Sequence, residues 1–143
     1  MSGRATENEA NKTVIRRLVE EVLNAGDLAR TDEVIGAGFI EHNPAVPDQA
    51  PGPEGFRQVN SLLRSAFPDL SLTIEEMIAE RDKVAVRFTA RGTHRGEFAG
   101  VPPSGNRVAW EVVSIIRIAE GKVAERWSQS DALGLMQQLQ TDI

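Results

Sequence analysis

The apolar residues of this 143-residue chain change their spacing at Leu70. Before Leu70 they recur every three or four positions, the period of one helical face, which predicts helices over Glu7–Asn24, Leu28–Ile35 and Pro53–Ala66. After Leu70 they alternate with polar residues, as expected for half-buried strands, and short turns separate the runs. Helices followed by consecutive strands predict an α+β fold with an antiparallel sheet from about Leu70 to Ser130.

Glycine and proline residues delimit these elements. Gly26 stands where a C-cap glycine would end the first helix, and Pro53 suits the first position of the third. Gly36 and Gly38 are expected to break the second helix and to form a linker. A closing helix is predicted over Asp131–Gln140.

The composition excludes several classes of protein. With 41% apolar and 26% charged residues, the chain is predicted to be one domain over residues 1–143, with a polar tail over about 1–8. No apolar run approaches the roughly 18–20 residues that cross a bilayer, and no targeting pattern precedes the first helix, so a cytoplasmic protein is expected. The net charge of −5 with scattered basic residues argues against a nucleic-acid partner. Without cysteine, and with two histidines, neither a metal nor a thiolate site is expected.

Acid–base chemistry in this chain would therefore depend on a carboxylate or a histidine. Asp131 is the main candidate, because it lies four residues after Trp127 where the last strand meets the last helix. In one interpretation it is an N-terminal helix cap, stabilised by the helix dipole. In the other its side chain points into a pocket between sheet and helices, where burial favours a protonated carboxyl group. The residues alone leave both interpretations open.

The C-terminal run G-K-V-A-E-R-W-S-Q-S-D-A-L-G-L-M-Q-Q-L resembles the signature of the SnoaL-like polyketide (ester) cyclases. The resemblance extends to His42-Asn43-Pro44, to Phe67-Pro68-Asp69-Leu70 and to the glycine-rich residues 92–105, in the expected order from about Lys12 to Leu139. It implies the NTF2-like (cystatin-like) cone of the ketosteroid-isomerase superfamily. In that cone, N-terminal helices pack on a curved sheet and enclose a pocket.

The same resemblance implies a cofactor-free intramolecular aldol condensation that closes a ring of a polyketide ester. Asp131 would be the general acid/base and His94 a donor to the developing oxyanion. The ligand would be a small hydrophobic or polyaromatic molecule, and the protein a homodimer or homotetramer. The predicted substrate-binding residues are His42, Asn43, Phe56, Leu63, Trp110, Ser114 and Trp127.

The strand pattern adds a geometric expectation. Because the last two strands are joined by a tight turn at Glu120-Gly121, Trp110, Ser114 and Trp127 are expected to face one cavity together with His94 and Asp131. Phe56 and Leu63 are expected to cover that cavity from the third helix. Val113 and Ile115 would then lie on the opposite face of the sheet, where a second copy could cover them.

Two other function classes remain open. The cone could serve as a non-catalytic small-molecule-binding or dimerisation module, or as a related cofactor-free hydroxylase, isomerase or epoxide hydrolase. The absence of tyrosine argues against a steroid isomerase with a Tyr-based oxyanion hole. An Asp–Arg–Asp epoxide hydrolase would need a second aspartate, but the strand region offers only the turn residue Asp82. Each candidate also has a structural interpretation, since His94 could lie in an exposed hairpin, His42-Asn43 in a turn and both tryptophans in the core.

Overall fold

The computed structural model describes residues 3–141. The chain begins with α1 (Gly3–Arg17), which continues directly into a π-helical segment (Leu18–Asn24). The remaining elements, in chain order, are a 3-10 turn (Leu28–Arg30), α2 (Thr31–Val34), β1 (Ile35–Glu41), α3 (Gly52–Ala66), β2 (Ser71–Glu80), β3 (Lys83–Thr93), β4 (Arg107–Ala119), β5 (Lys122–Ser130) and α4 (Ala132–Leu139). The predicted helices are thus present, although the first begins four residues before Glu7.

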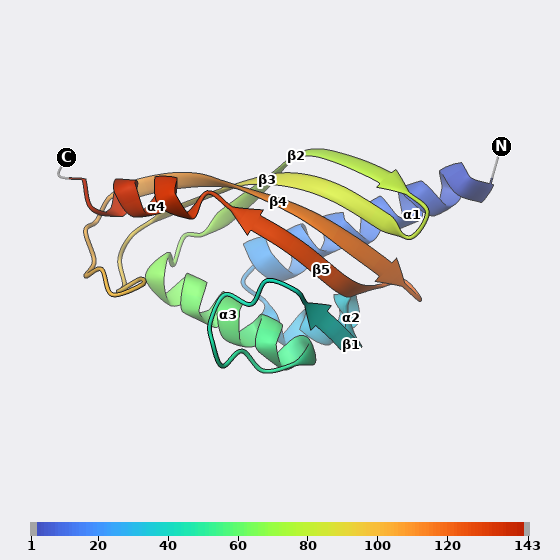
Figure 1. Cartoon of the computed structure of the whole chain (residues 1–143), viewed down its shortest axis with the longest axis horizontal. Coiled ribbons are helices and arrows are strands. Elements are labelled where there is room, and N and C mark those ends of the chain that lie inside the picture. Colours follow the sequence, from blue (N-terminus) through green and yellow to red (C-terminus); the bar gives the residue numbers. More distant parts are fainter. Residues whose placement is uncertain (1–2, 142–143) are drawn as a thin grey trace.

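The strands form one sheet in the order β1-β5-β4-β3-β2 (Figure 1). Strands β2 to β5 are antiparallel as predicted, but β1 pairs with β5 in parallel, which makes the sheet mixed. The prediction of a linker at Gly36 and Gly38 is therefore wrong, since both lie in β1. A Cβ on Gly36 would come within 3.3 Å of the Val123 carbonyl oxygen, so glycine suits the close approach of β1 to β5.

The helices cover the concave face of the sheet (Figure 1). Ile15, Val22 and the buried residues between them pack against inward-facing side chains of β3 and β4, such as Val84 and Ile116. Alternate residues of both strands are buried, because successive side chains of a strand point to opposite faces. This packing forms the main core, and it leaves the opposite, convex face of the sheet uncovered by helices.

A second core cluster lies toward α4, and its centre is Phe67. The ring of Phe67 is fully buried, and its centroid lies 5.2 Å from that of Trp110, 5.4 Å from that of Phe98 and 5.8 Å from that of His94. Leu135 and Leu139 of α4 complete the cluster. The short C-terminal helix is therefore held mainly by apolar packing on the far end of β4.

Side-chain amides protect two exposed strand segments. Asn24 donates from Nδ2 to the Leu72 carbonyl oxygen (2.9 Å) and accepts from the Leu72 N–H (2.7 Å) on the edge strand β2. Gln138 of α4 makes the same pair of bonds to the backbone of Ala109, at 2.7 and 2.9 Å, beyond the point where β5 leaves the sheet. Both amides satisfy backbone groups that could otherwise pair with another chain.

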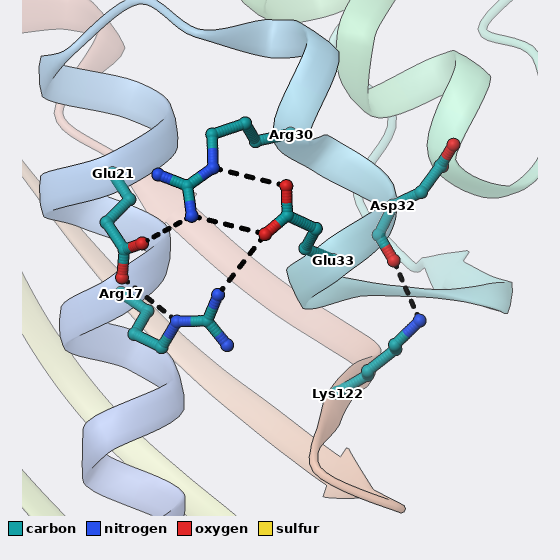
Figure 2. Close-up of polar contacts among 6 residues, drawn as sticks. All are labelled: Arg17, Glu21, Arg30, Asp32, Glu33 and Lys122. Carbon is teal, nitrogen blue, oxygen red and sulfur yellow. Dashed lines mark hydrogen bonds and ion pairs between the residues drawn. The ribbon is translucent and has the colours of Figure 1, made fainter.

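Four side chains form a ring of alternating charge that joins α1 and its continuation to α2 (Figure 2). Arg17 and Arg30 each contact both Glu21 and Glu33, at distances between 2.7 and 3.6 Å. Beside the ring, the Lys122 ammonium donates to the Asp32 carbonyl oxygen at 2.8 Å. These contacts lie on the surface, where ion pairs are sensitive to salt and to pH.

Acidification is expected to remove the stabilising contribution of this ring. Hydrogen bonds from Arg17 and Arg30 hold the pKa of Glu21 and of Glu33, respectively, below the ordinary value of 4.5. The contribution is therefore complete above about pH 4.5, the value for the unfolded chain, and is lost as the pH falls through the lower folded pKa values. Glu33→Gln should lower the urea midpoint at pH 7 but hardly at pH 3. Glu20→Gln, outside the ring, is the control, and equal shifts of the Glu33 variant at both pH values would contradict this prediction.

Candidate functional site

Asp131 lies where β5 leaves the sheet and α4 begins. Its N–H donates to the Glu111 carbonyl oxygen at 2.9 Å, and its Oδ1 accepts from the Gly134 N–H, also at 2.9 Å. The side chain is therefore an N-cap, as the first interpretation predicted, and the residue is exposed. Among the described residues, Oδ2 has no hydrogen-bond partner.

A row of polar side chains leads along the concave face of β5 to Asp131. Arg126, Ser128 and Ser130 pair with Ile116, Ser114 and Val112 of β4, which point toward the helices. The two serine hydroxyl oxygens, of Ser114 and Ser128, lie 3.0 Å apart, and Ser114 is buried as its position on the inward face predicted. We call the three β5 residues Arg126, Ser128 and Ser130, together with their β4 neighbour Ser114, the β5 polar row.

The loop after β1 and the end of β1 support this row. The Asn43 Oδ1 accepts from the Ser128 N–H at 2.8 Å. Asn43, one of the predicted substrate-binding residues, therefore contacts the backbone of the row. Arg126 donates from Nε to Glu41 Oε1 at 2.7 Å, and a second guanidinium nitrogen contacts the same oxygen. The Glu41 side chain is only 6% exposed and that of Arg126 24% exposed.

The contributions of Glu41 and Arg126 were not found in the sequence, because β1 was not recognised as a strand. A hollow of about 210 Å³ next to this pair is lined by Phe39, Ile40, Glu41, Pro44, Gln49, Ala50, Pro51 and Gly52. Its lining joins the end of β1 to the loop that precedes α3. Because Arg126 is paired with Glu41, the charge of the only cationic member of the β5 polar row is neutralised.

Trp127 does not share a face with Trp110, and the prediction that it does is wrong. It pairs with Ile115 and lies on the convex side, where its ring stacks on His42 with centroids 4.5 Å apart. An irregularity in the pairing between Arg117 and Ile118 shifts the strand, so Val123 points inward whereas Trp127 points outward. A one-residue shift reverses the side to which every following side chain points.

His42 belongs to the same convex-face group. Its Nε2 lies 2.8 Å from Glu125 Oε1, and Arg117 donates from Nε to the other oxygen of Glu125 at 2.5 Å. The hydrogen bond from Arg117, and then that from His42, lower the pKa of Glu125. His42 therefore stacks on Trp127 and contacts Glu125 on the convex face, on the opposite side of the sheet from Ser114.

His94 is fully buried and does not contact Asp131. Its Nδ1 accepts from the Ser104 N–H at 3.2 Å and lies 2.9 Å from the Ser104 hydroxyl, which assigns the ring proton to Nε2. That Nε2 is buried without a partner among the described residues. His94 pairs with Asn106 of the strand-joining loop whereas Asp131 pairs with Glu111, five residues along, or about 17 Å at strand spacing. The two residues are therefore held at different points along β4, and their sharing of one cavity stays a prediction.

The remaining predicted residues divide between the two core clusters. Phe56 packs edge-to-face on Phe39, at 6.4 Å between centroids, in the main core. Leu63 and Trp110 belong to the cluster around Phe67. Phe56, Leu63 and Trp110 therefore pack in the core of this structure, whereas the residues that precede Asp131 along the concave side of β5 are those of the β5 polar row.

No group of three or more metal-ligating side chains occurs among residues 3–141. Within the same range, no helix is both long and apolar enough to cross a membrane.

Comparison with known proteins gives a consistent assignment. The family model of the SnoaL-like polyketide cyclases matches residues 13–139. The chain is 31% identical over 136 residues to the aklanonic acid methyl ester cyclase DnrD of Streptomyces peucetius, covering 88% of each protein. It is 30% identical over 119 residues to the nogalonic acid methyl ester cyclase of Streptomyces nogalater, covering 81% of this chain and 87% of the relative.

The fold leads to the same assignment. The structure of TsrD from Streptomyces laurentii superposes with a TM-score of 0.83 at 31% identity, over 92% of this chain and 96% of that one. Helices packed on one face of a curved sheet agree with the NTF2-like cone that the sequence motifs implied. Because the family model and the relatives span most of its length, this chain belongs to the SnoaL-like polyketide cyclase family.

Proposed function

We propose that the protein is a cofactor-independent ester cyclase that closes a ring by intramolecular aldol condensation, with Asp131 as the general acid/base. The observation that carries this proposal is whether each carboxylate on these strands is paired with a cation. Glu41 on β1, Glu111 on β4 and Glu125 on β5 each lie within ion-pair distance of an arginine. Asp131, in contrast, has no cationic partner among the described residues, and its Oδ2 accepts no hydrogen bond there, so this carboxylate oxygen is open to a substrate.

The proposed reaction conserves the atoms of its substrate. Asp131 Oδ2 takes a proton from the carbon next to a carbonyl group, so that a C–H bond breaks, an O–H bond forms and the electron pair enters the enolate. The enolate carbon then attacks a second carbonyl group of the same molecule, and the new alkoxide takes the proton back from Asp131. Hydroxyl groups of the β5 polar row, at Ser128 and Ser130, are the candidate donors to the developing oxyanion. His94 is buried away from Asp131, so its predicted role as a donor would require a rearrangement of the loop that carries Ser104.

The main alternative is a binding module without catalysis. The observation in its favour is that Asp131 is exposed and that its carboxylate caps α4 through the N–H of the third helical residue. In that case the cone would bind a hydrophobic ligand, and the carboxylate would contribute only to the stability of α4. The two candidates differ in whether a bound ester is converted.

The test is incubation with aklanonic acid methyl ester, the compound named for one group of curated relatives. The proposal predicts a product of unchanged mass and altered retention and absorbance, formed in the presence of a chelator and without added cofactor. Liquid chromatography with mass spectrometry measures this conversion. Tryptophan quenching by the ester without any conversion would contradict the proposal and support the binding module.

We also propose that two copies associate through the convex face of the sheet. Register places Ile78, Ala85, Ile115 and Trp127 next to one another across β2, β3, β4 and β5. Ile78 and Ile115 are exposed large apolar residues, and a shallow hollow lies over them. An apolar row that crosses four strands is typical of an interface, because scattered single apolar residues would not align.

This association has a direct measurement. Sedimentation analysis at micromolar concentration should give twice the chain mass of 15.6 kDa, and Ile115→Glu should reduce it to one chain. Leu62→Glu is the matched control, because Leu62 has a similar exposure (51% against 44% for Ile115) but lies on α3. A monomeric wild-type chain would exclude this interface.

A further inference from the structure

We propose that Gly134 is a positioning residue for Asp131, because its lack of a side chain lets the Asp131 carboxylate lie across the first turn of α4. This inference rests on the proposed function of Asp131. A Cβ built on Gly134 would lie 2.2 Å from Asp131 Oδ2, 2.7 Å from Cγ and 2.9 Å from Oδ1. All three distances are shorter than real Cβ contacts, so any other residue would displace the carboxylate.

The usual reasons for a glycine do not apply at this position. Gly134 is not among the residues with positive φ, so its backbone conformation is open to other residues. Glycine is also a poor helix former, and it occupies the third position of an eight-residue helix. The close neighbour is the side chain of Asp131 rather than another strand or helix. The steric requirement therefore comes from the carboxylate.

The cap itself differs from the common arrangement. Helices regularly carry glutamate or glutamine at the third position behind a capping side chain, so a capping bond does not in general require glycine there. Here Asp131 has ψ of 70°, outside the extended region, and its carboxylate lies over the Cα of Gly134. In this orientation the Gly134 N–H holds Oδ1, and Oδ2 is left without a partner among the described residues.

A methyl group at position 134 would force the carboxylate to rotate away from this orientation. Oδ2 would have to move by about 1 Å, from 2.2 Å to an ordinary contact distance from the added Cβ. A misplacement of about 1 Å can cost about 10²-fold in rate. We therefore expect Gly134→Ala to lower kcat for aklanonic acid methyl ester roughly 10- to 100-fold with little change in KM.

A double-mutant cycle tests whether Gly134 acts through Asp131. In the Asp131→Asn background, Gly134→Ala should reduce the residual kcat no further, because the group that it positions is already absent. Gly38→Ala is the matched control, since a Cβ there meets no atom within 4 Å. Full activity of Gly134→Ala alongside an inactive Asp131→Asn overturns this inference and leaves the proposed function intact. Full activity of Asp131→Asn overturns both.

Thermal unfolding gives an independent arm in case Gly134→Ala folds poorly. With Asp131 present, Gly134→Ala should lower Tm, because the methyl group and the carboxylate compete for one space. In the Asp131→Ala background the same change should raise Tm, because alanine is the better helix former. An equal loss of Tm in both backgrounds would overturn the steric coupling, since the clash would then lie elsewhere.

Discussion

Asp131→Asn is expected to lower the turnover of aklanonic acid methyl ester by roughly 10²–10⁴-fold while the chain stays folded. Asparagine keeps an oxygen that accepts from the Gly134 N–H, and it caps helices about as well as aspartate. It cannot take a proton from carbon, however, so only the chemical step should fail. Steady-state kinetics give kcat, and tryptophan quenching by the ester reports whether binding is retained.

Two variants separate this result from a purely structural role. Asp131→Ala removes the cap and should cost about 1 kcal/mol of unfolding free energy in addition to the turnover. Asp27→Asn is the control, because Asp27 precedes a short helical turn and its side chain makes no capping bond. If folded Asp131→Asn keeps wild-type turnover, Asp131 is a cap only, and another group must serve as the general base.

Phe67→Ala is expected to cause the largest loss of stability, about 3–5 kcal/mol, because it empties the centre of the cluster below α4. The ring is fully buried and contacts Trp110, Phe98 and His94. On its other side it packs against Gly92, where a Cβ would lie only 2.9 Å from the Cβ of Phe67. Neighbours packed this closely on several sides cannot collapse fully into the space that the ring leaves.

Urea unfolding of Phe67→Ala measures this loss. Phe67→Leu retains part of the volume and should cost clearly less, and Leu62→Ala on the exposed face of α3 should stay within about 0.5 kcal/mol of wild type. A loss below about 1 kcal/mol for Phe67→Ala would show that the cluster does not hold α4. The order of the three variants tests the packing independently of any substrate.

Part of the candidate site could be predicted from the sequence. Asp131 at the start of an apolar helix, and Ser114 on the inward face of β4, both followed from local pattern and lie where they were expected. Asn43 also contacts the concave row. The pairing of Glu41 with Arg126 joins residues 85 positions apart, and no local pattern predicts such a pair.

Periodicity along the chain was sufficient to predict the helices, the antiparallel strands after Leu70 and the change from one to the other there, because the helical and strand periods are local properties of the backbone. The short strand β1 was missed. The face of the sheet on which Trp127 lies could not be predicted from periodicity. It depends on one irregularity in the pairing of β4 with β5, and a shift of one residue moves a side chain from the concave face to the convex face. The parallel pairing of β1 and the separation of His94 from Asp131 are likewise consequences of long-range register. Such register is set by contacts between distant segments, which exist only once the sheet has formed.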